Sequence, residues 1–427
     1  MSLRSLLRGR GVSIQLATKR RVTQPPLTRY LVVFGLFILS LITYIDRVCI
    51  SSAKGPIAAD LVLSDQAMGL AFSAFALGYA LAQVPSGWLA DRYGPRLALA
   101  GIVSAWSLLT AMTGAVRSLT QLLVVRFFFG MAEAGAFPGS ARTFYNWLSA
   151  GERGRANGIL FSGSRIGAAL AFPLLAWMLE RFEWRMSFAW LGALGLAWAA
   201  AWVLFFRDYP KGVEPRIARD REKSELHAPS IAKRDVMLAM GQYFASNFTF
   251  FICLSWMLPF LQEHYRLSPS SAASYAMIPL LGGACALWVA GFSIDFLFKT
   301  RLRGWSRRLP AITGFALAAA GMGAIRFAES PAEAVACFAI ATFGADLSLS
   351  PSWVFCLDIG GRKAGAVSGS MNMAGNIGSF VSANAFPWLY GLTGSANTYF
   401  GVAGLLNLAA VACWVGMPLR APRTNTD

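Results

Sequence analysis

The sequence predicts an all-α membrane protein with about twelve transmembrane helices arranged in two six-helix halves. Hydrophobic residues make up 56% of the 427 residues and charged residues only 14%, whereas soluble proteins carry about 25% charged residues. Apolar segments of about 20 residues, long enough to cross a bilayer, recur along the chain. Short motifs of the first half also return in the second half.

The apolar segments define the order of the helices. Those of the first half are expected at 30–50, 66–86, 97–115, 120–146, 156–179 and 186–206. Those of the second half are expected at 236–262, 271–295, 309–327, 332–355, 364–390 and 397–418. The chain then divides into a basic tail (1–29), a first half (30–206), a linker (207–235), a second half (236–418) and a short tail (419–427).

The net charge of +17 is concentrated in the N-terminal tail, the linker and the loop at 299–308. All three lie on one predicted side, and basic loops face the cytoplasm. We therefore expect a multi-pass protein of the bacterial cytoplasmic (inner) membrane, with the linker and both termini inside. The lipid bilayer accounts for this charge, so no nucleic-acid partner is expected, and a monomer is sufficient.

The composition gives no indication of an enzyme. Only two histidines occur, His227 and His264, and no H-E-x-x-H, G-x-S-x-G, Walker or Rossmann motif is present. The six cysteines are scattered without a C-x-x-C pair. We expect no metal, no cofactor and no ATP drive, which leaves an ion gradient as the energy source.

A charged turn between the second and third spans is the most specific local motif. It contains Gly87, Asp91, Arg92, Gly94 and Arg96. A helix cannot turn back inside hydrocarbon, so this turn is expected at a water-facing surface. Asp91 can accept hydrogen bonds from a helix N-terminus, which predicts a gating role for the motif.

Two motifs of the first half are repeated at a similar offset. Residues 87–91 are echoed by 291–295, and residues 153–158 by 362–369. The repeats indicate duplicated halves.

Charged residues inside the spans are candidates for function because their burial is costly. Asp46 and Arg47 lie near the end of the first span, although both could already have emerged into the following loop. Arg126 and Glu133 are seven residues apart in the fourth span and share one helix face. Burial favours the neutral form of Glu133, which suits a proton carrier; the alternative is a static ion pair.

Further polar residues lie in other spans. Arg165 can bind an anionic ligand or pair with Glu133 or Asp46. Asn372 and Asn376 are four residues apart and suit hydroxyl groups, or bond neighbouring helices. Tyr79 and Gln83 likewise share one helix face, and Asp346 is buried by position.

Together these motifs resemble the anion:cation symporter branch of the major facilitator superfamily. That branch includes bacterial galactonate, glucarate and hexuronate permeases and animal vesicular glutamate and sialic acid carriers. The motifs that carry the resemblance are the 87–96 turn, 44–47, Tyr79 with Gln83 and 85–88, Arg126 with 133–138, 184–185 with Phe188, Trp256 with Pro259, and 369–376.

The resemblance implies roles for several residues. Asp46 and Glu133 match carboxylates that carry protons. Arg47 and Arg126 match arginines that handle the substrate carboxylate or couple it to protonation. Tyr79 and Asn376 match positions near the sugar acid. Galactonate-type carriers favour glutamine where Ser164 and Arg165 stand here, and this extra cation favours a diacid.

The sequence thus predicts a secondary active transporter that imports a small organic anion with protons by alternating access. A sugar acid such as a hexonate, hexuronate or aldarate is the expected substrate. The candidate substrate-binding residues are Arg47, Tyr79, Arg126, Ser164, Arg165, Asn372 and Asn376. The alternatives are uptake of an aromatic or dicarboxylic acid, or a major facilitator exporter or antiporter.

Overall fold

The computed structural model describes residues 26–210, 231–267 and 269–418. Most of the N-terminal tail and of the linker, including His227, and all of the C-terminal tail therefore lie outside the described residues. The helices of the first half are α1 (Pro26–Ser52), α2 (Lys54–Leu61), α3 (Asp65–Tyr93), α4 (Pro95–Thr113), α5 (Leu119–Glu133), α6 (Ala136–Trp147), α7 (Arg153–Arg181) and α8 (Trp184–Phe205).

The second half repeats this arrangement. Its α-helices are α10 (Lys233–Ser255), α11 (Met257–His264), α12 (Pro269–Phe298), α13 (Arg308–Ala324), α14 (Pro331–Leu347), α15 (Leu349–Gly360), α16 (Ala364–Thr393) and α17 (Asn397–Gly416). Three short 3₁₀ helices are η1 (Arg303–Trp305), η2 (Ile325–Phe327) and η3 (Gly361–Lys363).

Every predicted span coincides with one helix or one broken pair of helices. The fourth, seventh and tenth spans are broken, into α5 and α6, α10 and α11, and α14 and α15. Among the described residues nine stretches are long and apolar enough to cross a membrane, and one of them, Pro331–Thr393, contains both α14 and α16. This set does not include α7 and α10.

Several helix starts follow directly from local chemistry. The Ser64 and Ser118 side chains accept hydrogen bonds from the first turns of α3 and α5. Ser330 and Glu333 form a reciprocal capping box at α14. Gly94 adopts φ +82°, which favours glycine, and Pro95 then begins α4.

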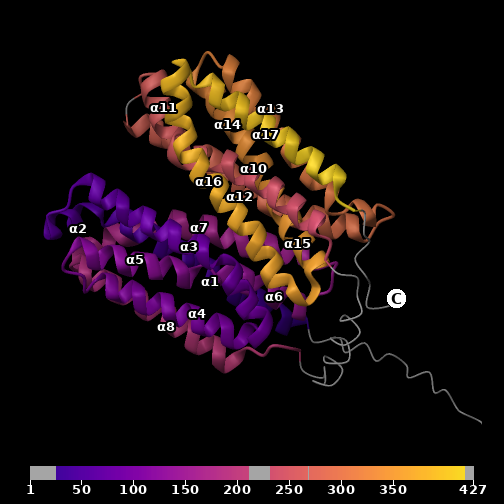
Figure 1. Cartoon of the computed structure of the whole chain (residues 1–427), viewed down its shortest axis with the longest axis horizontal. Coiled ribbons are helices and arrows are strands. Elements are labelled where there is room, and N and C mark those ends of the chain that lie inside the picture. The colour runs from indigo at the N-terminus through magenta and orange to yellow at the C-terminus, as the bar shows by residue number, and fades with distance from the viewer. Residues whose placement is uncertain (1–25, 211–230, 268, 419–427) are drawn as a thin grey trace, which may run out of the picture.

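The two halves contact each other near one end of the bundle and diverge toward the other (Figure 1). We call the first end the linker end, because residues 206–210 and 231–232 lie there with the α3–α4 turn. The other, which carries α2 and α11, is the α2 end. The principal contacts between the halves are those of α3 with α16 and of α7 with α12.

Candidate functional site

A small cavity of about 80 Å³ lies between the two halves. It is lined by Tyr44, Arg47, Tyr79, Phe137, Phe161, Ser164, Arg165, Tyr243, Ser246, Asn247, Phe250, Asp346, Leu349, Trp353, Asn372 and Asn376. Six of the seven candidate substrate-binding residues are in this set, although they come from four different helices.

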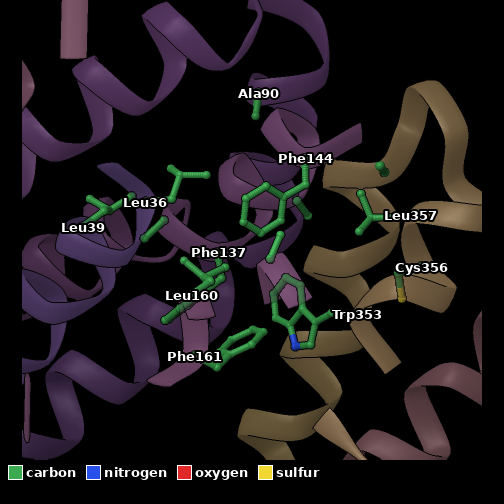
Figure 2. Close-up of a cluster of buried hydrophobic side chains, with 14 of the residues drawn as sticks. Leu36, Leu39, Ala90, Phe137, Phe144, Leu160, Phe161, Trp353, Cys356 and Leu357 are labelled. Carbon is green, nitrogen blue, oxygen red and sulfur yellow. The ribbon is translucent and has the colours of Figure 1, made fainter. Parts of the chain in front are cut away.

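Aromatic side chains from both halves form one wall of the cavity. Phe137 of α6 and Phe161 of α7 stack with ring centroids 5.2 Å apart, and Trp353 of α15 lies 5.2 Å from Phe161. The three belong to a buried cluster that extends through Phe144 and Leu357 (Figure 2). This cluster separates the polar cavity from the linker end.

Arg47 and Glu133 form an ion pair at the cavity wall. Arg47 Nε donates to Glu133 Oε2 over 3.0 Å, and their side chains are 20% and 0% exposed. The Arg47 guanidinium lies 4.4 Å from the Tyr79 ring and 5.0 Å from the Tyr44 ring, positions typical of cation–π contacts. Arg47 Nη2 has no hydrogen-bond partner among the described residues. The arginine thus faces the cavity while its carboxylate partner lies behind it.

Asp46 and Arg126 lie deeper in the first half. Asp46 is 1% exposed, so it has not emerged into the loop after α1. Its Oδ2 accepts a hydrogen bond from Trp106 Nε1 over 3.1 Å. Arg126 is 3% exposed and lies over the rings of Phe75 and Phe129. Arg126 is therefore not in the cavity wall, in contrast to the other candidate arginines.

Arg165 pairs with a residue of the second half. Its Nη2 donates to Asp346 Oδ1 over 2.7 Å, and its guanidinium lies 3.9 Å from the Phe250 ring centroid. The expected alternatives of Glu133 or Asp46 as its partner are therefore wrong. Glu133 is paired with Arg47, and Arg165 contacts the second half across the cavity.

The polar faces predicted for Tyr79 with Gln83 and for Asn372 with Asn376 contact each other across the two halves. Asn372 of α16 donates to Gln83 Oε1 over 2.9 Å and to the Tyr79 hydroxyl over 3.4 Å, both on α3. Asn376 donates to the Asn372 carbonyl over 2.8 Å. The Ser164 hydroxyl is used within α7, where it donates to the Phe161 carbonyl.

Asp91 joins α3 to the N-terminus of α16. Its two oxygens accept hydrogen bonds from the backbone N–H groups of Gly365 and Ala366 over 3.0 and 2.8 Å. Arg142 lies 3.9 Å away. Glycine is required at both facing positions, because a Cβ on Gly87 would lie 2.2 Å from the Gly365 carbonyl oxygen. This is the α3–α16 joint.

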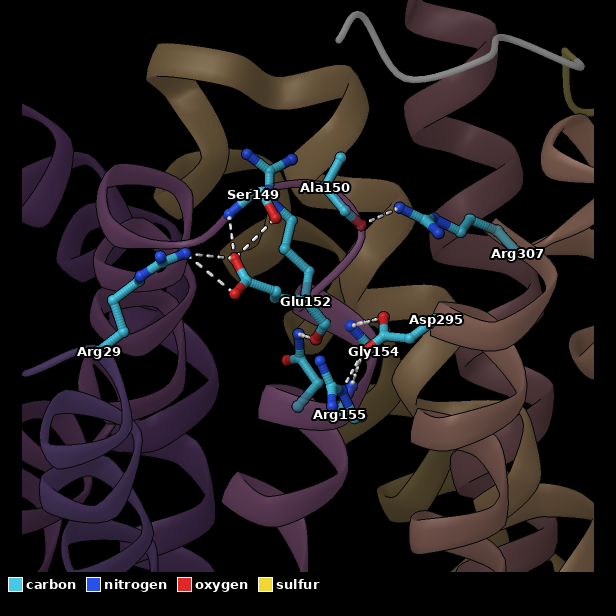
Figure 3. A network of polar contacts seen from close by, with 10 residues as sticks. Arg29, Ser149, Ala150, Glu152, Gly154, Arg155, Asp295 and Arg307 are labelled. Carbon is cyan, nitrogen blue, oxygen red and sulfur yellow. Dashed lines mark hydrogen bonds and ion pairs between the residues drawn. The ribbon is translucent and has the colours of Figure 1, made fainter. Parts of the chain in front are cut away.

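Its counterpart joins α12 to the N-terminus of α7 (Figure 3). Asp295 accepts from the backbone N–H groups of Gly154 and Arg155, each over 3.0 Å, and from Arg155 Nε over 2.9 Å. A Cβ on Gly291 would lie 2.8 Å from the Gly154 carbonyl oxygen. The sequence echoes thus correspond to two similar joints at the linker end, which we call the α7–α12 joint and the α3–α16 joint.

The rest of the turn motif fixes the first half locally. Arg96 donates from its backbone to Asp208 Oδ1 over 2.8 Å and from its side chain to the Val203 carbonyl. Burial raises the pKa of the Asp208 carboxyl, and the Arg96 hydrogen bond opposes this. Arg92 is exposed and lies over the Trp88 ring, so it makes no joint with the second half in the described contacts.

Sequence reasoning missed the polar network beside these joints. Asp358 pairs with Arg153 over 2.8 Å and with Arg307 over 3.1 Å. Arg307 also donates to the Ala150 carbonyl (Figure 3). In the sequence, the only indication of this network was that its charged residues lie near the ends of predicted spans. Among the described residues no group of three metal-binding side chains is found.

Comparison with known proteins identifies the family. The family model described as Major Facilitator Superfamily matches residues 36–383. The chain belongs to the Major Facilitator Superfamily. It is thus a multi-pass membrane transport protein and not an enzyme.

Two relatives carry names of organic-acid transporters. A probable sulfoacetate transporter of Cupriavidus necator is 31% identical, with 92% of this chain and 94% of the relative covered. A probable L-galactonate transporter of Escherichia coli is also 31% identical, with 91% and 90% covered. A solved proton:xylose symporter shares the fold, with a TM-score of 0.71 at 15% identity over 92% of this chain and 96% of its own.

Proposed function

We propose that this protein imports a small organic anion together with protons, by alternating access in the bacterial inner membrane. The linker and both termini face the cytoplasm, so the described arrangement, joined at the linker end, is the outward-facing one. The names of the relatives support an organic acid as substrate, since they include sulfoacetate and L-galactonate transporters.

The Arg47–Glu133 pair is the single observation that carries this proposal. The substrate carboxylate and the Glu133 carboxylate are rivals for one guanidinium at the cavity wall. Protonation of Glu133 removes its charge and frees Arg47 for the substrate, with which it makes a charge-assisted hydrogen bond. Proton release then restores the rival carboxylate and expels the substrate.

Asp46 is the second proton site of the proposal. It is 1% exposed and its described partner is an indole N–H, not a cation. Such a carboxyl is stable when neutral, because an unpaired buried charge is costly. Import of an anion works against an inside-negative potential by about 2.3 kcal/mol per charge per 100 mV. A monoanion therefore needs more than one proton to profit from the potential, and a dianion needs two protons to avoid working against it. The two buried carboxyls can carry two protons.

Arg126 couples the two carboxyls. It is buried in the same half and makes cation–π contacts with Phe75, whose ring also lies 5.6 Å from the Arg47 guanidinium. Neutralising either carboxyl changes the charge balance around Arg126 and Arg47 together. Arg126 thus acts through this network rather than by contact with the substrate.

Proton movement with the substrate tests the proposal. Proteoliposomes with a pH-sensitive dye inside receive galactonate, galactarate or sulfoacetate outside, without an imposed gradient. We expect at least one acid to acidify the lumen, whereas the uncharged alcohol galactitol does not. If sodium is needed for uptake and the lumen pH stays constant, the coupling ion is wrong. If no acid enters at all, the substrate class is wrong.

A further inference from the structure

The Arg165–Asp346 pair is not used by the transport cycle proposed above. Arg165 Nη2 and Nε bond the two Asp346 oxygens over 2.7 and 3.4 Å. The pair lines the same cavity as Arg47 and joins the first half to the second. Among the described residues Arg165 Nη1 makes no hydrogen bond, and the side chain is 13% exposed. The cavity thus contains a second cation with a free donor.

The Asp346 carboxylate packs closely against α12 of the second half. Gly283 of α12 faces it, and a Cβ at this glycine would lie 2.1 Å from Asp346 Oδ2. The missing side chain makes room for the carboxylate. Asp346 thus packs against Gly283 of the second half, and Arg165 reaches it across the cavity.

The two cavity arginines enter at different levels along the bundle. Gly163 and Gly167 of α7 pack against the carbonyls of Phe37 and Leu41 of α1. Arg165 therefore lies beside about residue 39 of α1. That level is roughly eight residues before Arg47 along α1, so the backbones of the two arginines are separated by ~12 Å along the helix axis, at about 1.5 Å per residue. Two long arginine side chains and a short two-headed ligand can span this separation.

We propose that Arg165 is a second anion subsite and that the transported anion is a short dianion, with one acid group on Arg47 and the other on Arg165. The inference rests on the proposed function, since Arg47 holds the first acid group there. Without substrate, Asp346 balances the charge of Arg165. The second acid group accepts a hydrogen bond from the free Nη1 of Arg165 and shares the guanidinium with Asp346. A monoanion has no acid group to place at this position.

The cavity size indicates the length of the dianion. A water takes about 30 Å³ of liquid volume, so a cavity of about 80 Å³ has space for roughly three waters. This matches short diacids, such as a dicarboxylate or a carboxylate–sulfonate, better than a six-carbon sugar diacid. The polar residues at the wall, Asn372 and Asn376, then contact acid oxygens rather than a row of sugar hydroxyls.

Binding of matched acid pairs to the purified full-length protein tests this inference. The pairs are succinate with butyrate, sulfoacetate with acetate, and galactarate with galactonate, measured by calorimetry. We expect the short dianions to bind at least tenfold more tightly than their monoanions. Equal binding within every pair overturns the second subsite but leaves the Arg47 anion site intact. No binding by any acid overturns the proposed function as well.

Variants locate the effect. Arg165→Gln is expected to weaken succinate or sulfoacetate binding about tenfold to a hundredfold and butyrate binding little. The exposed control Arg117→Gln should leave both unchanged. Asp346→Asn removes the rival carboxylate, so dianion binding should be unchanged or tighter. If Asp346→Asn weakens dianion binding as much as Arg165→Gln, the pair is structural and the proposal is wrong.

Discussion

Replacing Asp91 by asparagine removes the charge of the α3–α16 joint but keeps the shape of the side chain. The carboxylate accepts two backbone hydrogen bonds, from Gly365 and Ala366, in the first turn of α16. An amide can accept only one of them, and its NH₂ group then faces the other donor. The substitution therefore weakens the joint without emptying the space that the side chain fills.

The size of the effect follows from these contacts. A hydrogen bond to a charged group contributes about 1.5–3 kcal/mol, and a carboxylate at a helix N-terminus about 0.3–2 kcal/mol. The two terms overlap, so we expect the joined arrangement to lose about 2–3 kcal/mol. At about 1.4 kcal/mol for each factor of ten, this is a shift of about 30- to 150-fold toward the arrangement that is open at the linker end.

Distances between spin labels measure this shift. Labels at Tyr93 and Arg301, exposed positions at the linker end of the first and second halves, should report a new, longer distance in Asp91→Asn. Glu329→Gln, an exposed carboxylate-to-amide change at the α2 end, is the matched control. Substrate binding in detergent should persist in both variants. An unchanged distance distribution in Asp91→Asn would refute the view that this carboxylate holds the halves together.

Three further predictions address the substrate, the packing and the orientation. Arg47→Lys keeps the charge but loses the planar fork, so acid binding measured by calorimetry should weaken about tenfold; equal affinity would argue against a guanidinium–carboxylate contact. Gly365→Ala places a Cβ 2.4 Å from the Gly87 carbonyl oxygen, so the distance between the spin labels at Tyr93 and Arg301 should lengthen. Gly282→Ala, where a Cβ meets open space, should leave that distance unchanged. The same distance in both variants would contradict the close-packing argument. A cysteine introduced at 211–230 should react with a membrane-impermeant thiol reagent only after the inner face is exposed; labelling from outside intact cells would invert the orientation.

The helices could be predicted because the bilayer imposes a simple rule on the sequence. A span needs about 20 apolar residues whichever helices it packs against. Each predicted span therefore corresponds to a helix or a broken pair of helices in the structure. The breaks within spans could not be predicted this way. The break after Glu133, for example, takes only Ala134 and Gly135 out of the helix, and the hydrophobic run continues across it.

The individual site residues could be found, but not their partners. Arg47, Arg165 and Glu133 stand out because charge is rare in a span. Which carboxylate meets which arginine depends on how the halves pack. Arg165 meets Asp346, 181 residues away in sequence, and no local pattern connects the two. The partner of Asp91 was easier to predict, because this carboxylate needs only the backbone N–H groups of a helix N-terminus. The repeated motif at Asp295 indicates a second contact of the same kind.

The most direct test of the central claim compares net uptake with exchange in Glu133→Gln. Glutamine keeps a polar side chain beside Arg47 but cannot carry a proton. In proteoliposomes loaded with the substrate, the variant should exchange labelled substrate across the membrane and fail to accumulate it when a proton gradient is imposed. Full proton-driven accumulation by Glu133→Gln would contradict the account and leave Glu133 as a structural partner of Arg47.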